Sequence, residues 1–74
     1  SLLPIGVVDV INTFSKGDVV SIVDENDCEF ARGIVNYDSE ACKKVMGCHS
    51  DDIIKILNFK NYDAIVTRDN ITIL

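Results

Sequence analysis

The side chains that could carry out catalysis or bind a metal are few in this sequence. His49 is the only histidine, and Cys42 and Cys48 are the thiols nearest to it. A structural zinc site needs four ligands at characteristic spacings, whereas this group supplies three ligands without such a spacing. Acid–base catalysis needs a nucleophile, a base and an orienting group within reach of one another. We therefore predict no catalytic residue and no metal site, with His49 as an exposed loop or cap residue.

The neighbouring acids Asp51 and Asp52 do not form a catalytic pair, because successive helical residues point about 100° apart. Acidic side chains in the first turn of a helix are instead favoured by the helix dipole. The chain also lacks the glycine-rich motifs that hold nucleotide phosphates. We predict that these residues bind no cofactor and that the chain by itself is not an enzyme.

Basic side chains are the remaining candidates for a binding function. The formal net charge is −5 and the isoelectric point is near 4.5, so RNA binding would require a local basic patch. The five aromatic residues are spread along the chain, which leaves few rings for base stacking. A solvated helix face, with local pairing to Glu40, is the simpler interpretation of the two adjacent lysines. The candidate contacts for RNA or for a domain interface are Arg32, Gly33, Lys43, Lys44 and Arg68.

Length and composition predict one small globular domain. The chain has 74 residues, of which 47% are hydrophobic, and no apolar run approaches the roughly 18 residues of a membrane-spanning helix. Three cysteines without a C-x-x-C pair predict reduced thiols and a cytoplasmic location, away from membranes. Because the chain begins with Ser1, we expect it to be part of a longer protein.

The elements that must position the basic residues begin with two predicted strands. Residues 5–11 are mostly β-branched and follow Pro4, which is tolerated at the start of a strand. A turn at residues 15–18 leads to the second strand, Val19–Val23, which has the weak alternation of a strand buried on both faces.

A third strand is predicted to run antiparallel to the second. Asp24–Asp27 has the composition of a hairpin turn, because Asn and Asp tolerate positive φ angles. The apolar face of the third strand is predicted to carry Cys28, Phe30 and Ile34, with Arg32 interrupting it. Gly33 indicates a bulge or a close backbone approach at this point.

Two short helices are predicted to follow. Asp38 or Ser39 can cap the first, which has Lys43 and Lys44 late and ends at Gly47. Ser50 is predicted to cap the second, which pairs Asp51 with Lys55 and ends near Asn58. The predicted buried faces consist of Ala41, Cys42, Val45 and Met46 in the first helix and Ile53, Ile56 and Leu57 in the second.

Two more strands, residues 64–66 and 71–74, are predicted to flank a hairpin at residues 67–70. Closure of this hairpin beside the third strand could bring Arg68 toward the other basic residues. Five strands and two helices predict a fold that is mainly β with two short helices (α+β), in which a small mixed β pseudo-barrel carries the helices on one side.

Several segments, read together, resemble a known domain family. In order and spacing, nearly all 74 residues are similar to the C-terminal PUA domain of glutamate 5-kinase. The resemblance implies a single PUA domain over residues 1–74, with a PUA-like pseudo-barrel and an N-terminal amino-acid-kinase domain outside this chain. The segments that carry it are SLLPIGVV, KGDVVSIVDEN, ARGIVNYDSEACKKVMG, HSDDIIKILNF and TRDNITIL.

The same resemblance implies a function. Glutamate 5-kinase uses ATP and magnesium to convert glutamate to L-glutamyl 5-phosphate in the first step of proline biosynthesis, and proline inhibits it. The resemblance places the catalytic and metal-binding residues in the kinase domain, and it implies an accessory or regulatory role for these residues through contacts with that domain and with neighbouring subunits of a homo-oligomer. PUA domains elsewhere bind structured RNA, and Arg32, Gly33, Lys43 and Lys44 match that region by position, so RNA binding is the alternative.

Overall fold

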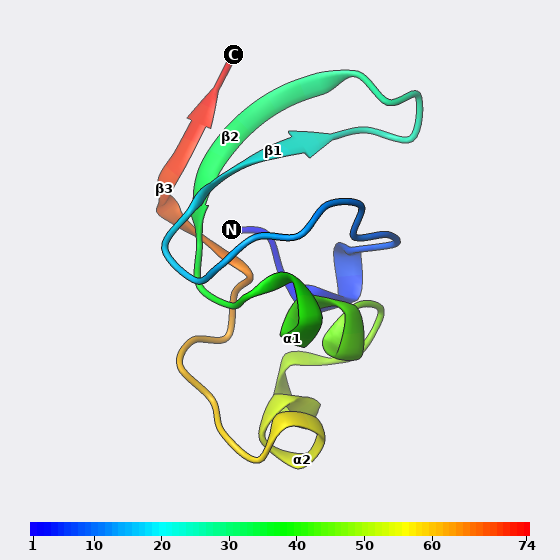
Figure 1. The fold of residues 1–74 in the computed structure, drawn as a ribbon, viewed down its shortest axis with the longest axis vertical. Coiled ribbons are helices and arrows are strands. Elements are labelled where there is room, and N and C mark those ends of the chain that lie inside the picture. Colours follow the sequence, from blue (N-terminus) through cyan, green and yellow to red (C-terminus); the bar gives the residue numbers. More distant parts are fainter.

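The computed structural model describes residues 1–74 and shows a three-stranded antiparallel sheet at one end and two helices at the other (Figure 1). The sheet has the order β1-β2-β3, and β2 pairs with both of its neighbours. This architecture confirms the predicted α+β class. The elements are a 3-10 turn η1 (Pro4–Gly6), β1 (Val19–Val23), β2 (Glu29–Val35), α1 (Ser39–Val45), a 3-10 turn η2 (Ser50–Asp52), α2 (Ile53–Leu57) and β3 (Val66–Ile73).

The hairpin between β1 and β2 forms as predicted. β1 has the expected bounds, and Asp27 adopts a positive φ of 61° in the turn. The carboxylate of Asp24 accepts hydrogen bonds from the backbone N–H groups of Asn26 and Cys28, which fixes the turn. The predicted burial of β1 on both faces is wrong, because Ile22 is its only buried residue.

β2 buries the face opposite to the predicted one. Ala31, Gly33 and Val35 are buried, whereas Phe30 and Ile34 point outward and are 46% and 42% exposed. Small side chains occupy the inner face because neighbouring elements pack closely against it. At Gly33, even a Cβ atom would lie 2.9 Å from the backbone oxygen of Asn70. The close backbone approach inferred from this glycine is therefore confirmed.

The predicted first strand, residues 5–11, does not form. The segment begins with the single turn η1 and continues without regular structure. The carbonyl oxygen of Pro4 accepts hydrogen bonds from the N–H groups of Val7 and Gly47, so the turn is docked on the end of α1. The β-branched residues serve a different purpose, since Val7 and Val10 are half-buried against the core.

The predicted hairpin at residues 67–70 is also wrong, because β3 runs through it as one strand. Gly33 pairs with Ile71 and Val35 pairs with Val66, so four residues of β3 lie opposite Ile34 alone. The polar stretch is therefore a large bulge in a strand that stays beside β2 on both sides of it. On the edge of β3 that faces away from β2, Leu2 forms an isolated antiparallel bridge with Val66.

α1 agrees with the prediction from its sequence. The Asp38 carboxylate accepts a hydrogen bond from the N–H of Ala41 at 2.8 Å, and the helix is followed by Gly47 with a φ of +76°. Ala41, Cys42 and Val45 are buried in its inward face, whereas Lys43 and Lys44 are exposed. The local pairing of these lysines with Glu40 is absent, since no carboxylate lies within 4 Å of either ammonium group.

The second helix begins differently from the prediction. His49 caps it, because its Nδ1 accepts a hydrogen bond from the N–H of Asp51, and the first turn is the 3-10 turn η2. Lys55 pairs with Asp52 at 3.8 Å rather than with Asp51. α2 ends at Asn58, as expected, and Asn58 adopts the left-handed conformation. The predicted buried face is wrong in part, because Ile53 is the only buried residue of α2.

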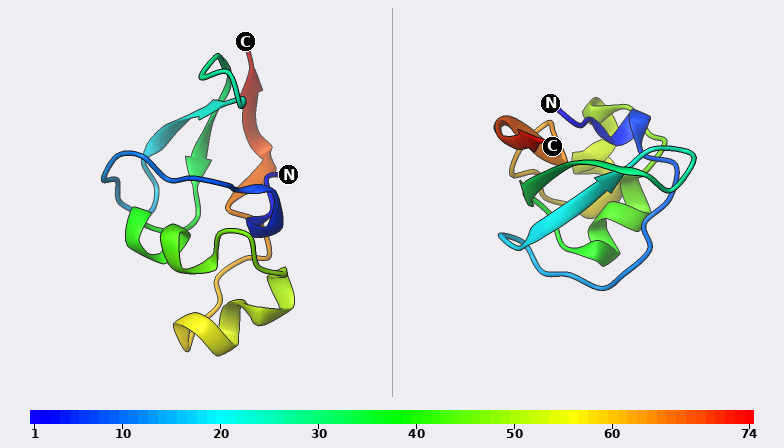
Figure 2. Two further views of the ribbon diagram at one scale, coloured as in Figure 1. Left: turned by 90° about the vertical axis from the view of Figure 1, so that its right-hand side faces the viewer. Right: turned by 90° about the horizontal axis from the view of Figure 1, so that it is seen from above.

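The core lies between the sheet and the helices (Figure 2). Val35 and Val66 come from the sheet, and Val45 and Ile53 come from the two helices, all at 1% exposure or less. No helix is long enough and apolar enough to cross a membrane.

Candidate interaction surface

Arg32 lies on the outward face of β2 and is held by Glu29. Its Nε and one terminal nitrogen donate hydrogen bonds to the two oxygens of the Glu29 carboxylate at 2.9 and 3.0 Å. The arrangement is bidentate, which is the strongest geometry for an arginine and a carboxylate. Two of the N–H donors of Arg32 are therefore used inside the domain before any ligand arrives.

This pair changes the acidity of its carboxyl group. Hydrogen bonding from Arg32, and secondarily from Ser21, lowers the pKa of Glu29 from 4.5 to about 2. The same pair raises the pKa of Arg32. Because the pKa of Glu29 is depressed in the folded state, its stabilising contribution is present above pH 4.5 and is lost as the pH falls toward 2.

Replacing Arg32 by glutamine is expected to return the pKa of Glu29 close to 4.5, because the main cause of the depression is removed. An NMR titration of the carboxyl carbon measures this pKa directly. Arg68→Gln is the matched control and should leave the pKa of Glu29 near 2. A Glu29 pKa that stays low in the Arg32 variant would contradict the ion pair.

Gly33 and the bulge of β3 form the floor of a shallow depression beside Arg32. Asp69 and Asn70 from the bulge, together with Thr72, line this depression along with Val19 and Ile34. Arg68 is exposed and immediately precedes the lining residues Asp69 and Asn70. The depression therefore mixes one paired arginine, one carboxylate and two aliphatic side chains, rather than collecting positive charge.

Lys43 lines a different depression, at the start of α1. Its neighbours there include Asp38 and Glu40, so carboxylates also line this depression. Lys44 is exposed. The two lysines belong to α1, whereas Arg32, Gly33 and Arg68 belong to the sheet. Convergence of the four basic residues into one patch stays a prediction.

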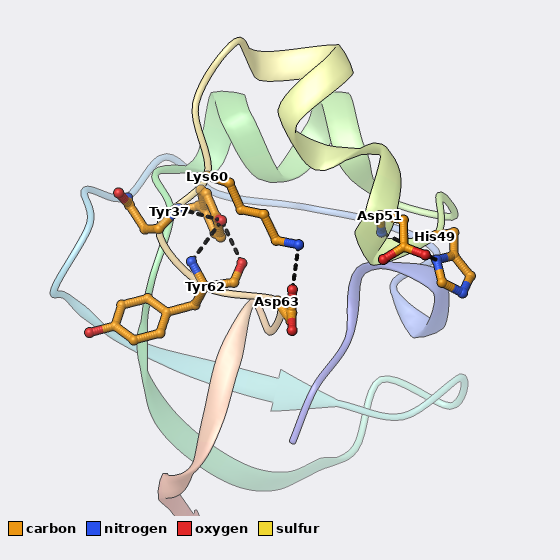
Figure 3. A network of polar contacts seen from close by, with 7 residues as sticks. Tyr37, His49, Asp51, Lys60, Tyr62 and Asp63 are labelled. Carbon is orange, nitrogen blue, oxygen red and sulfur yellow. Dashed lines mark hydrogen bonds and ion pairs between the residues drawn. The ribbon is translucent and has the colours of Figure 1, made fainter.

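Tyr37 forms a hydrogen-bonded hub that the sequence did not reveal (Figure 3). Its phenol donates to the carbonyl oxygen of Tyr62 at 2.6 Å and accepts from the N–H groups of Asn61 and Tyr62, each at 3.0 Å. The adjoining Asn36 donates from its amide to the carbonyl of Ala64 and to the hydroxyl of Thr67. The only signal for this hub in the sequence is the polar pair Asn36 and Tyr37, directly after the apolar strand β2. These two residues tie the end of β2 to the loop that leads into β3.

The thiols and acids do not assemble into a reactive centre in this structure. Cys42 is buried, its thiol lies 3.6 Å from the carbonyl oxygen of Tyr37, and burial together with the charge of Asp38 raises its pKa to about 11. Such a thiol is a poor nucleophile near neutral pH. No group of three or more His, Cys, Asp or Glu side chains is placed to hold a metal ion.

Comparisons with known proteins agree on one family. A model of the PUA domain matches residues 1–57. Proteins named glutamate 5-kinase match the whole chain, with 47% identity over 74 residues in Thermoanaerobacter pseudethanolicus, 46% over 77 residues in Methanosarcina mazei and 43% over 74 residues in Herminiimonas arsenicoxydans. The matched region is 20%, 19% and 20% of these relatives, respectively, so the chain spans about a fifth of their length.

Proposed function

This chain belongs to the PUA domain family, and from that premise we propose that it is the accessory, regulatory domain of a glutamate 5-kinase. The observation that carries the proposal is the similarity to proteins of that name over the entire chain, at up to 47% identity. In this proposal, the catalytic residues and the sites for ATP and magnesium lie in a kinase domain outside these 74 residues. The longer protein makes L-glutamyl 5-phosphate for proline biosynthesis in the cytoplasm.

The arrangement of side chains supports an accessory role over a catalytic one. The one histidine is exposed and serves as a helix cap, and the one buried thiol has a raised pKa. The domain would act by contact, through its own kinase domain and through neighbouring subunits of a homo-oligomer. Such contacts can alter how readily an inhibitor such as proline stabilises one arrangement of the subunits.

Deleting residues 1–74 from the full-length protein is expected to preserve phosphoryl transfer from ATP to glutamate while changing its inhibition by proline. The measurement is the initial rate at fixed substrate concentrations over a series of proline concentrations. A deletion variant whose rate and proline inhibition both match those of the intact protein would overturn the proposal.

RNA binding is the second candidate, and the observation that favours it is the exposure of Lys43, Lys44 and Arg68 without a carboxylate within 4 Å. The net charge of −5 and the pairing of Arg32 with Glu29 oppose it. A titration of the full-length protein with structured RNA at low salt separates the two candidates. Binding that is lost in a Lys43→Ala, Lys44→Ala double variant would support RNA recognition, and no binding at high micromolar protein would dismiss it.

A further inference from the structure

The outward face of the sheet exposes several large apolar side chains to water. We call this surface the outer sheet face and define it by Val19, Ser21, Phe30, Arg32, Ile34, Thr72 and Leu74. Its four large apolar side chains are between 42% and 68% exposed. The solvent face of an antiparallel sheet normally carries polar residues, so an apolar face of this kind indicates a docking surface.

The strand register places these side chains together. Val19 is the direct partner of Ile34, and Arg32 is the direct partner of Thr72 in the next strand. The N–H of Leu74 donates to the carbonyl oxygen of Phe30, which extends the same register by one residue beyond the Ala31–Ile73 pair. Because alternate residues of a strand share a face, the aliphatic pair lies at one end, Phe30 and Leu74 lie at the other, and Arg32 lies between them.

The charge on the outer sheet face is balanced within the domain. Arg32 is its only basic residue, and the carboxylate of Glu29 neutralises it through two hydrogen bonds. A phosphate-rich partner would gain little here, because the charge of the arginine is already paired with a carboxylate. An apolar protein surface would gain from covering the four large side chains.

Ser1 and Leu2 lie against the edge of the sheet. The hydroxyl of Ser1 accepts a hydrogen bond from the N–H of Arg68, and the backbone of Leu2 is bonded to that of Val66. Residues 1 and 2 are thus held against β3, the strand that contributes Thr72 to the outer sheet face. If the kinase domain of the proposed function is N-terminal to this domain, as the family resemblance implies, it would be connected at the edge of this same sheet.

We infer that the outer sheet face docks on an apolar surface of the kinase portion of its own polypeptide. This inference rests on the proposed function, in which about four fifths of the protein lies outside these residues, as in the relatives that the chain matches. A domain joined at β3 meets this face at high effective concentration, so a modest apolar contact is enough to keep it covered.

Hydroxyl-radical footprinting of the full-length protein tests the inference, with labelling rates corrected for the intrinsic reactivity of each residue type. Phe30 and Leu74 are expected to be oxidised several-fold more slowly than Val8, which is 89% exposed and lies outside the outer sheet face. In an Ile34→Asp variant, their labelling should rise several-fold. The matched control is Val8→Asp, which places the same charge on another exposed aliphatic position and should leave their labelling unchanged.

Three results would overturn the inference. Labelling of Phe30 and Leu74 as fast as Val8 in the unaltered protein would show an open face, and no rise in the Ile34 variant would show that the face is covered by something else. Protection that disappears on dilution, together with a fall in molecular mass, would assign the face to a second copy. Amide exchange at Val45 and Ile53 verifies that the variant is folded, and Ile34→Ser replaces it if these core amides lose protection.

The footprint and the proline response are independent measurements. If Phe30 and Leu74 are protected but deleting the domain changes neither the rate nor the proline inhibition, the proposed regulatory function is rejected and the docking stands. If the deletion changes the proline inhibition but Phe30 and Leu74 are not protected, the docking is rejected and the proposed function stands.

Discussion

Replacing Gly33 by alanine is expected to destabilise the domain by roughly 1–3 kcal/mol, the usual cost of forcing an extra carbon into a close-packed site. A Cβ at this position would lie 2.5 Å from Cγ1 of Val66 and 2.9 Å from the carbonyl oxygen of Asn70. Val66 is fully buried and the Asn70 oxygen belongs to the backbone of β3, so relief requires β2 and β3 to separate. Urea denaturation measures the change in the free energy of unfolding.

Gly6→Ala is the matched control for this substitution. Nothing lies within 4 Å of a Cβ at residue 6, and Gly6 does not adopt a positive φ. Alanine there should leave the free energy of unfolding unchanged or raise it by up to about 1 kcal/mol, because it restricts the unfolded chain. Equal stability of the two variants would contradict the close approach of β2 and β3 at Gly33.

Replacing Tyr37 by phenylalanine is expected to lower the free energy of unfolding by roughly 1–3 kcal/mol, the cost of leaving buried polar groups without partners. The phenol oxygen is the acceptor for the N–H groups of Asn61 and Tyr62 and the donor to the carbonyl of Tyr62. Tyr37 is only 1% exposed, so water has little access to replace these bonds. Amide hydrogen exchange should accelerate most at residues 61 and 62.

Tyr62→Phe removes the same atom from a tyrosine in the same loop and serves as the control. The ring of Tyr62 is 54% exposed, and its phenol makes no hydrogen bond within the domain. A change within about 0.5 kcal/mol is expected, as for other surface substitutions. If the two variants lost equal stability, the hub at Tyr37 would not account for the order of the loop.

Local patterns were reliable where the chain itself supplies the needed contacts. The Asp-rich turn before β2 fixes itself through the carboxylate of Asp24, and Asp38 caps α1 by accepting a hydrogen bond from Ala41. Both interactions join residues that are no more than four apart. Sequence reasoning therefore predicted the β1–β2 hairpin and the first helix, including the exposure of the two lysines on it.

Long-range packing overturned the predictions that used hydrophobicity alone. The larger apolar residues of β2 were expected inside, yet the backbone of Asn70 approaches so closely that the inner face needs glycine at residue 33. The polar residues 67–70 looked like a turn, but β2 pairs with the chain on both sides of them and keeps the strand continuous. Residues 5–11 have strand-forming side chains, yet no strand of the sheet pairs with their backbone.

The sequence by itself determined the α+β class, the hairpin, the first helix and the family resemblance, because these depend on short-range chemistry and on the order of segments. The tertiary structure decided which face of β2 is buried, that Glu29 holds Arg32, and that Tyr37 fastens the loop before β3. The first and third of these depend on elements far apart in the chain meeting at close range, whereas the second joins two residues of β2 three positions apart, beside a register shift between β1 and β2. Arg32, which the sequence offered as a candidate contact for RNA or for a domain interface, is in the folded domain paired with Glu29 on the outer sheet face.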